Sequence, residues 1–142
     1  MKVTIGKPPH KSDQKQKVRV KIHKHDTWNM DQTLAYIIVP MLKQLAETTV
    51  TGPPVELKDV PSKLRPKLGY ETPDHGMDYL YFDRWNWVLN EMIFAFSAKI
   101  DPSIEDQYFT EDGYDEAGME KHQKRVANGF RLFGKYYESL WD

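Results

Sequence analysis

Four side chains with metal-binding chemistry lie close together in the chain: His23, His25, Asp26 and Asp31. Two imidazoles with a carboxylate suit zinc or another divalent metal. We expect the two histidines to project from one face of a strand and the two aspartates to follow at its junction with a helix. At that place the aspartates also suit the free backbone N–H groups of the helix amino end. Both interpretations stay open, and because the spacing matches no known metal motif we predict no cofactor.

A single carboxylate, Glu91, interrupts a strongly apolar stretch. In a helix over residues 81–99 it falls between two apolar stripes, where a charge is costly unless a cation pairs with it. Arg84 lies on the same side two turns earlier, and Arg125 or Arg131 could reach it from a later helix. We expect a structural ion pair, with a general acid or base as the alternative.

The carboxy-terminal segment RVANGFRLFGKYYESLWD combines cations with planar rings, which suits an anionic planar ligand such as a nucleotide. With the two residues above, the candidate ligand-binding residues are Arg84, Glu91, Arg125, Arg131, Lys135, Tyr136 and Tyr137. Gly129 and Gly134 each cost a helix about 1 kcal/mol relative to Ala, so a neighbour should approach the backbone there. Helix packing explains that approach more simply than a ligand does.

The chain lacks the residues that several classes of function require. The chain has no Cys, which excludes disulfides, thiolate metal sites and a cysteine nucleophile. It also has no Gly-rich phosphate loop, no GxSxG elbow and no kinase signature. Its longest apolar stretch, Leu34 to Leu42, is far shorter than the roughly 20 residues of a membrane span, and the amino terminus has no signal-peptide core. We therefore expect neither catalysis nor a membrane partner.

Charge is distributed unevenly along the 142 residues, although the formal net charge is only -1. Residues 1–25 contain eight Lys and Arg and one Asp, whereas the remainder carries a net charge of -8. A basic arm on an acidic body predicts attraction to a polyanion or pairing with acidic segments of its own or another copy. No aromatic residue occurs before Trp28, so we expect no nucleic-acid partner and favour pairing with the acidic loop.

The elements that position these residues form an α-rich α+β fold in one domain over residues 1–142. Alternating apolar residues predict strands at Lys2 to Ile5 and Lys17 to His23, joined as a basic hairpin within residues 1–25. Helical spacing predicts three principal helices, at 29–47, 81–99 and 115–140. A Pro-rich loop at 48–80, with one helical turn near residues 61–64, and an acidic loop at 100–114 connect them.

Two features predict a homo-oligomer. A lone two-stranded ribbon is marginal in water, so the hairpin must lie on helices or meet another copy. The helix at 81–99 is apolar on more than half of its circumference and should be packed from two directions. We expect its main stripe to form the core with two later aromatics: Trp85, Val88, Leu89, Met92, Phe96, Phe130 and Phe133.

Three blocks of the chain resemble an uncharacterised protein family of tailed bacteriophages, many of them from marine metagenomes. The blocks are DTWNMDQTLAYIIVPMLKQL, RWNWVLNEMIFAF and NGFRLFGKYYESLWD, about a third of the chain. In the second block the family has an acidic residue where this chain has Asn90, which argues against a metal ligand there. The resemblance implies a viral origin and action in the host cytoplasm, and it brings no known activity.

The sequence therefore predicts a phage accessory protein that acts by binding, without turnover, as a homo-oligomer. Its partner would be a host protein or a small nucleotide. The first alternative is a sponge that sequesters a nucleotide signal among the basic and aromatic residues. The second is a metal-dependent hydrolase that uses His23, His25, Asp26 and Asp31.

Overall fold

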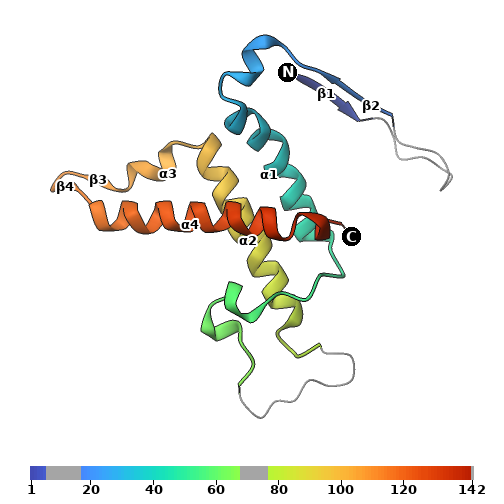
Figure 1. The fold of residues 1–142 in the computed structure, drawn as a ribbon. Helices are drawn as coiled ribbons and strands as arrows, with labels where there is room; N and C mark the ends of the chain where they lie inside the picture. The colour runs from blue at the N-terminus through green and yellow to red at the C-terminus, as the bar shows by residue number, and fades with distance from the viewer. Residues whose placement is uncertain (6–16, 68–76, 142) are drawn as a thin grey trace.

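The computed structural model describes residues 1–5, 17–67 and 77–141. It has three main helices with a two-stranded hairpin at the amino end and a second, smaller hairpin before the last helix (Figure 1). The strands are β1 (Lys2–Ile5), β2 (Val18–Lys21), β3 (Phe109–Thr110) and β4 (Gly113–Tyr114). The α-helices are α1 (Met30–Thr48), α2 (Tyr81–Ile100), the short α3 (Ser103–Asp106) and α4 (Glu116–Lys135). The 3-10 helices are η1 (Lys24–Thr27), η2 (Leu57–Asp59), η3 (Ser62–Leu64) and η4 (Tyr137–Ser139).

Helix α2 is the centre of the core, and it packs against both α1 and α4. The predicted stripe on α2 is confirmed, because all five of its members are buried: Trp85, Val88, Leu89, Met92 and Phe96. Helix α1 adds Ala35, Val39 and Leu42, and α4 adds Leu132. Phe130 and Phe133 are only partly buried, and their rings pack edge-on against Phe96.

The two glycines of α4 differ in their surroundings. A Cβ at Gly129 would lie 2.4 Å from the Glu91 carbonyl oxygen and 2.5 Å from the Ala95 Cβ, so α2 and α4 touch at this point. A Cβ at Gly134 would have no neighbour within 4 Å. The prediction of a close approach is therefore confirmed at Gly129, where helix packing accounts for it, and wrong at Gly134.

The Pro-rich segment wraps around the first half of α2. Tyr81 donates a hydrogen bond from its hydroxyl to the Gly52 carbonyl (2.9 Å), and Arg84 donates from Nη1 to the Leu64 carbonyl (3.2 Å). The predicted helical turn near residues 61–64 is present as η3. Residues 68–76 of this predicted loop lie outside the described part of the chain.

Two predicted segments differ from the structure. The acidic loop at 100–114 contains α3 and the β3–β4 hairpin, because Gly113 takes a positive φ of 125° that closes a tight turn after Asp112. The last predicted helix ends at Lys135 and not near Leu140, since its final turn tightens into η4. Asp115 caps α4 by accepting a hydrogen bond from the Gly118 N–H (2.9 Å).

The amino-terminal hairpin extends away from the helices (Figure 1). Its antiparallel register pairs Lys2 with Lys21 and Val3 with Val20, so one face is basic and the opposite face is apolar. Val18 and Val20 are each more than half exposed. The predicted loop between the strands, residues 6–16, lies outside the described residues, as do the lysines within it.

Candidate functional site

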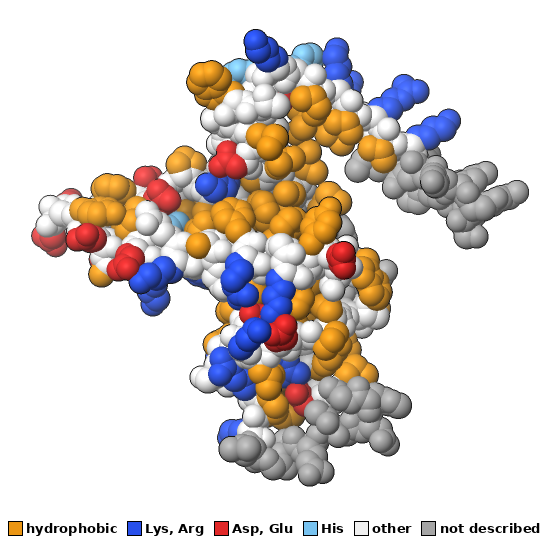
Figure 2. Space-filling view, viewed as in Figure 1, with side chains coloured by type: hydrophobic (Ala, Val, Ile, Leu, Met, Phe, Trp, Pro, Cys, Tyr) orange, Lys and Arg blue, Asp and Glu red, His pale blue; other side chains and the backbone are white. Residues whose placement is uncertain are grey.

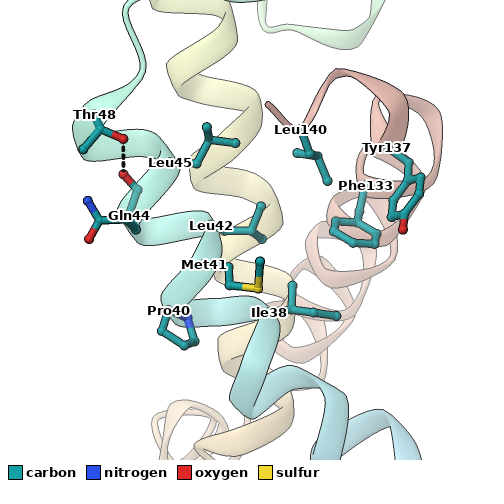
Figure 3. Close-up of a pocket in the computed structure, with 10 residues that line it drawn as sticks. All are labelled: Ile38, Pro40, Met41, Leu42, Gln44, Leu45, Thr48, Phe133, Tyr137 and Leu140. Carbon is teal, nitrogen blue, oxygen red and sulfur yellow. Dashed lines mark hydrogen bonds between the residues drawn. The ribbon is translucent and has the colours of Figure 1, made fainter. Parts of the chain in front are cut away.

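An open apolar groove lies between α1 and the end of the chain after α4, with a volume of about 870 Å³ (Figure 3). Side chains from the second half of α1 face side chains from the end of α4 and from η4 across it. Ten residues line it: Ile38, Pro40, Met41, Leu42, Gln44, Leu45, Thr48, Phe133, Tyr137 and Leu140. The Thr48 hydroxyl donates to the Gln44 carbonyl of its own helix (2.9 Å). The groove therefore offers mainly apolar contact.

The groove exists because α1 is apolar on two sides. One side, with Val39 at its centre, is buried against α2. The second side repeats at steps of three and four residues, through Leu34, Ile38, Met41 and Leu45. Ile38 and Leu45 are partly buried against the core, whereas Leu34 is exposed. Met41 stays 60% exposed at the edge of the groove. Exposed apolar surface that is contiguous along one face indicates a contact site for another molecule.

A buried carboxylate, Asp59, binds most of the predicted nucleotide-binding residues at the end of α4 through hydrogen bonds and ion pairs. Its side chain is only 2% exposed. It accepts hydrogen bonds from the Lys135 ammonium (2.5 Å) and the Tyr136 hydroxyl (2.7 Å), and the Arg131 guanidinium pairs with its other oxygen (2.9 Å). Lys135 also pairs with Glu56 (2.8 Å). These cations and the phenol therefore hold η2 against α4.

The pKa shifts at this cluster follow from its contacts. Burial acts to raise the pKa of Asp59, but hydrogen bonds from Lys135, Tyr136 and Arg131 outweigh it and hold the pKa below its ordinary value. Hydrogen bonds to Asp59 and Glu56 raise the pKa of Lys135. Burial raises the pKa of the Tyr136 phenol, and its bond to Asp59 adds to that shift. All three pKa shifts favour an ionised Asp59 beside a protonated Lys135.

Glu91 forms the predicted ion pair, and its partner is Arg125. The guanidinium donates through Nε (3.0 Å) and Nη2 (2.7 Å) to the carboxylate, whose side chain is 8% exposed. The same guanidinium stacks on the Phe94 ring, 3.7 Å from its centre. This prediction is confirmed, and the pair links α2 to α4.

Arg84 does not take part in that pair. Its two terminal nitrogens, Nη1 and Nη2, donate to the Asp78 carboxylate at 3.0 Å and 2.9 Å, and both side chains are buried. This bond, the backbone N–H of Leu80 and the charge of Arg84 lower the pKa of Asp78 against the effect of burial.

Tyr137 is exposed and lines the groove, with its ring 5.7 Å from that of Phe133. Of the predicted ligand residues, Tyr137 alone belongs to the groove, and each predicted cation already faces a carboxylate.

The four predicted metal ligands lie at the base of the hairpin without forming a ligand set. The strand ends at Lys21, two residues earlier than predicted, so His23 and His25 do not share a strand face. Asp26 accepts a hydrogen bond from the His23 N–H (2.7 Å) and pairs with the amino group of Met1 (2.6 Å). Asp31 pairs instead with Lys99 of α2 (3.2 Å). Across the described residues, no three acidic or imidazole side chains gather in a way that could hold a metal ion.

The sequence analysis did not identify two buried polar side chains as site residues, and the first is His122 of α4. Both of its ring nitrogens lack a hydrogen-bond partner, and the ring lies between Phe94 (5.4 Å) and Tyr108 (5.5 Å). The Glu105 carboxylate lies 3.6 Å from Nε2, beyond hydrogen-bonding distance. Asp59 was also missed, because a carboxylate in a Pro-rich segment normally faces water. Its buried neighbours Val55 and Val60 were the available signal.

No helix in the described part of the chain combines the length and the hydropathy needed to cross a membrane. Comparison with known proteins gave no match to any family model, curated protein or solved structure.

Proposed function

We propose that this protein is a phage accessory protein that acts by binding, without turnover, in the host cytoplasm, and that it does so as a homo-oligomer whose copies meet at the groove. The viral origin and the compartment come from the resemblance of three sequence blocks to a phage family. The observation that carries the binding function is the open apolar groove between α1 and the end of α4.

A second copy suits the groove because each copy offers both an exposed apolar side chain and an apolar hollow beside it. Met41 rises from α1 as an exposed, flexible side chain, and the hollow beside it is lined by Leu45 and Leu140. Around a two-fold axis, the ridge of each copy can enter the hollow of the other, so that one surface serves both partners. Burying such a patch supplies the apolar contact that stable dimer interfaces share.

The same geometry disfavours the nucleotide alternative. A nucleotide phosphate needs cations that are free to pair with it, whereas Arg84, Arg125 and Arg131 are already paired with Asp78, Glu91 and Asp59. Each of these carboxylates is buried, so releasing its cation would leave a buried charge unpaired. Binding through apolar contact involves no such cost.

The test is the mass of the protein in solution. At micromolar concentration, size-exclusion chromatography with light scattering should give a multiple of the 16.7 kDa chain mass. Met41→Lys should shift the protein to the monomer, because it buries an ammonium group in the interface. Tyr36→Lys is the matched control: Tyr36 is 59% exposed on the same helix but outside the groove, and its replacement should leave the mass unchanged. A monomeric wild type would refute the proposal.

A further inference from the structure

The amino-terminal hairpin presents an apolar sheet face that the described part of its own chain leaves largely exposed. Val18 and Val20 project from this face, and Ile22 continues it beyond the strand. The base of the hairpin is held by the pair between the Met1 amino group and Asp26. A two-stranded ribbon with an uncovered apolar face is marginal by itself, so this face needs an occupant.

The opposite face and the flanks of the hairpin restrict what that occupant can be. Lys17, Arg19 and Lys21 alternate with the valines, and Lys2 lies opposite Lys21. None of these cations is ion-paired with another described residue. Two hairpins packed through their apolar faces would leave all of these cations without an acidic partner, so the contact would lack charge complementarity. The occupant should be apolar at its centre and acidic around it.

The end of the molecule that carries β3 and β4 has this composition. Phe109 and Tyr114 are both more than half exposed, and their rings lie 5.1 Å apart on one side of the small hairpin. Glu111 and Asp112 form the turn beside them, and a hollow of about 550 Å³ next to Tyr114 is lined by acidic and apolar residues of α4. Residues 101–120 contain eight Asp and Glu and no Lys or Arg.

The two surfaces cannot meet within one chain in this structure. The β1–β2 hairpin and the β3–β4 hairpin lie at opposite ends of the molecule (Figure 1). In Figure 2, blue side chains follow the first hairpin, and red side chains gather at the far end over β3 and β4. The sequence favoured pairing of the basic arm with the acidic loop, and the separation of β1–β2 from β3–β4 suits a pairing between two copies.

We propose that the apolar face of the β1–β2 hairpin of one copy docks on the exposed Phe109–Tyr114 pair of a second copy. The stems of Arg19 and Lys21 are long enough to pass the edges of the ribbon, so their charged ends can reach carboxylates such as Glu111 and Asp112. A two-fold axis would make this contact twice, once at each end of the dimer. This inference rests on the proposed function, because it adds a second contact to the same homo-oligomer.

A charge exchange tests the contact. The hairpin variant Arg19→Glu/Lys21→Glu and the acidic-end variant Glu111→Lys/Asp112→Lys should each weaken self-association by about tenfold, since attraction becomes repulsion. Mixing the two variants should restore association, because both contacts are then attractive again. The control Lys63→Glu/Lys67→Glu makes the same charge change at exposed positions that form no ion pair with another described residue, and it should have no effect. Thermal unfolding of each variant verifies that the helical core is intact.

The salt dependence of self-association and a DNA-binding measurement distinguish the remaining outcomes. The hairpin contact should weaken between roughly 0.1 M and 1 M NaCl, where the Debye length falls from about 10 Å to about 3 Å, while an apolar groove contact should not. An oligomer that dissociates with Met41→Lys but tolerates both charge variants would refute the hairpin contact and leave the groove in place. A wild type that is monomeric at both salt concentrations would refute both. DNA duplex binding that the Arg19→Glu/Lys21→Glu variant abolishes would assign the hairpin to nucleic acid and overturn this inference.

Discussion

Substituting Gly129 by Ala tests the closest contact between α2 and α4. A helical Ala removes the entropy cost of Gly, a gain of about 0.5–1 kcal/mol. The new methyl group, however, would lie 2.4 Å from the Glu91 carbonyl oxygen and 2.5 Å from the Ala95 Cβ. The nearer atom belongs to the backbone of α2 and cannot rotate away, so the two helices must separate. Overpacking of this kind costs about 1–3 kcal/mol, and a rigid neighbour places this site near the upper end. We therefore expect a net loss of about 2 kcal/mol in the free energy of unfolding.

Gly134 provides a control in the same helix. A Cβ at this position meets nothing within 4 Å, so Gly134→Ala should raise the free energy of unfolding by about 0.5–1 kcal/mol. At about 3 °C per kcal/mol, the Tm should fall by about 6 °C for Gly129→Ala and rise by about 1.5–3 °C for Gly134→Ala. Urea unfolding of both variants, with unchanged m-values, checks the free energies. If Gly129→Ala proved as stable as Gly134→Ala, the helix contact described here would be wrong.

Three further predictions concern buried side chains. Trp85→Ala should cost about 3–5 kcal/mol, measured by urea unfolding, because the buried indole packs against Gly52 of the Pro-rich segment and the Tyr136 ring. A Tm within a few degrees of the wild type would contradict its place in the core. The lowered pKa of Asp59 means that its ionised form stabilises the fold above the ordinary carboxyl pKa, about 3.9, and that this stabilisation is lost as the pH falls through the lower folded value; a Tm profile from pH 7 to 2 should be less steep for Asp59→Asn, and an identical acid slope would count against the cluster. His122→Leu should change the free energy of unfolding by less than about 1 kcal/mol, because neither ring nitrogen loses a hydrogen bond, and a loss above about 2 kcal/mol would show that the imidazole has a partner.

Much of the fold could be predicted from the sequence because local patterns report local structure. Apolar residues at steps of three and four predicted α1, α2 and most of α4, and alternation predicted the first hairpin. The buried stripe through Trp85, Leu89 and Met92 and the pairing of Glu91 with a cation followed from the same periodicity. The β3–β4 hairpin was missed, although Asp112 followed by Gly113 is a turn signal, because the surrounding acidic residues indicated a solvated loop.

What the sequence could not determine depends on how the helices cross. Glu91 had three possible cations in the sequence, and only the packing of α4 on α2 assigns Arg125 to it. Arg131 pairs instead with Asp59 of η2, and Arg84 pairs with Asp78 just before its own helix. The groove is likewise absent from any local pattern, since its two walls are about 90 residues apart in the chain.

Composition alone determined that a basic arm and an acidic segment exist in one chain. Periodicity determined that α2 carries more apolar surface than one contact can cover, and α1 and α4 cover it from two directions. The tertiary structure decided that the groove stays open and that the two hairpins lie at opposite ends. The physical reason is that side-chain periodicity is set by residues a few positions apart, whereas surface complementarity depends on the relative placement of elements that only the packed core defines.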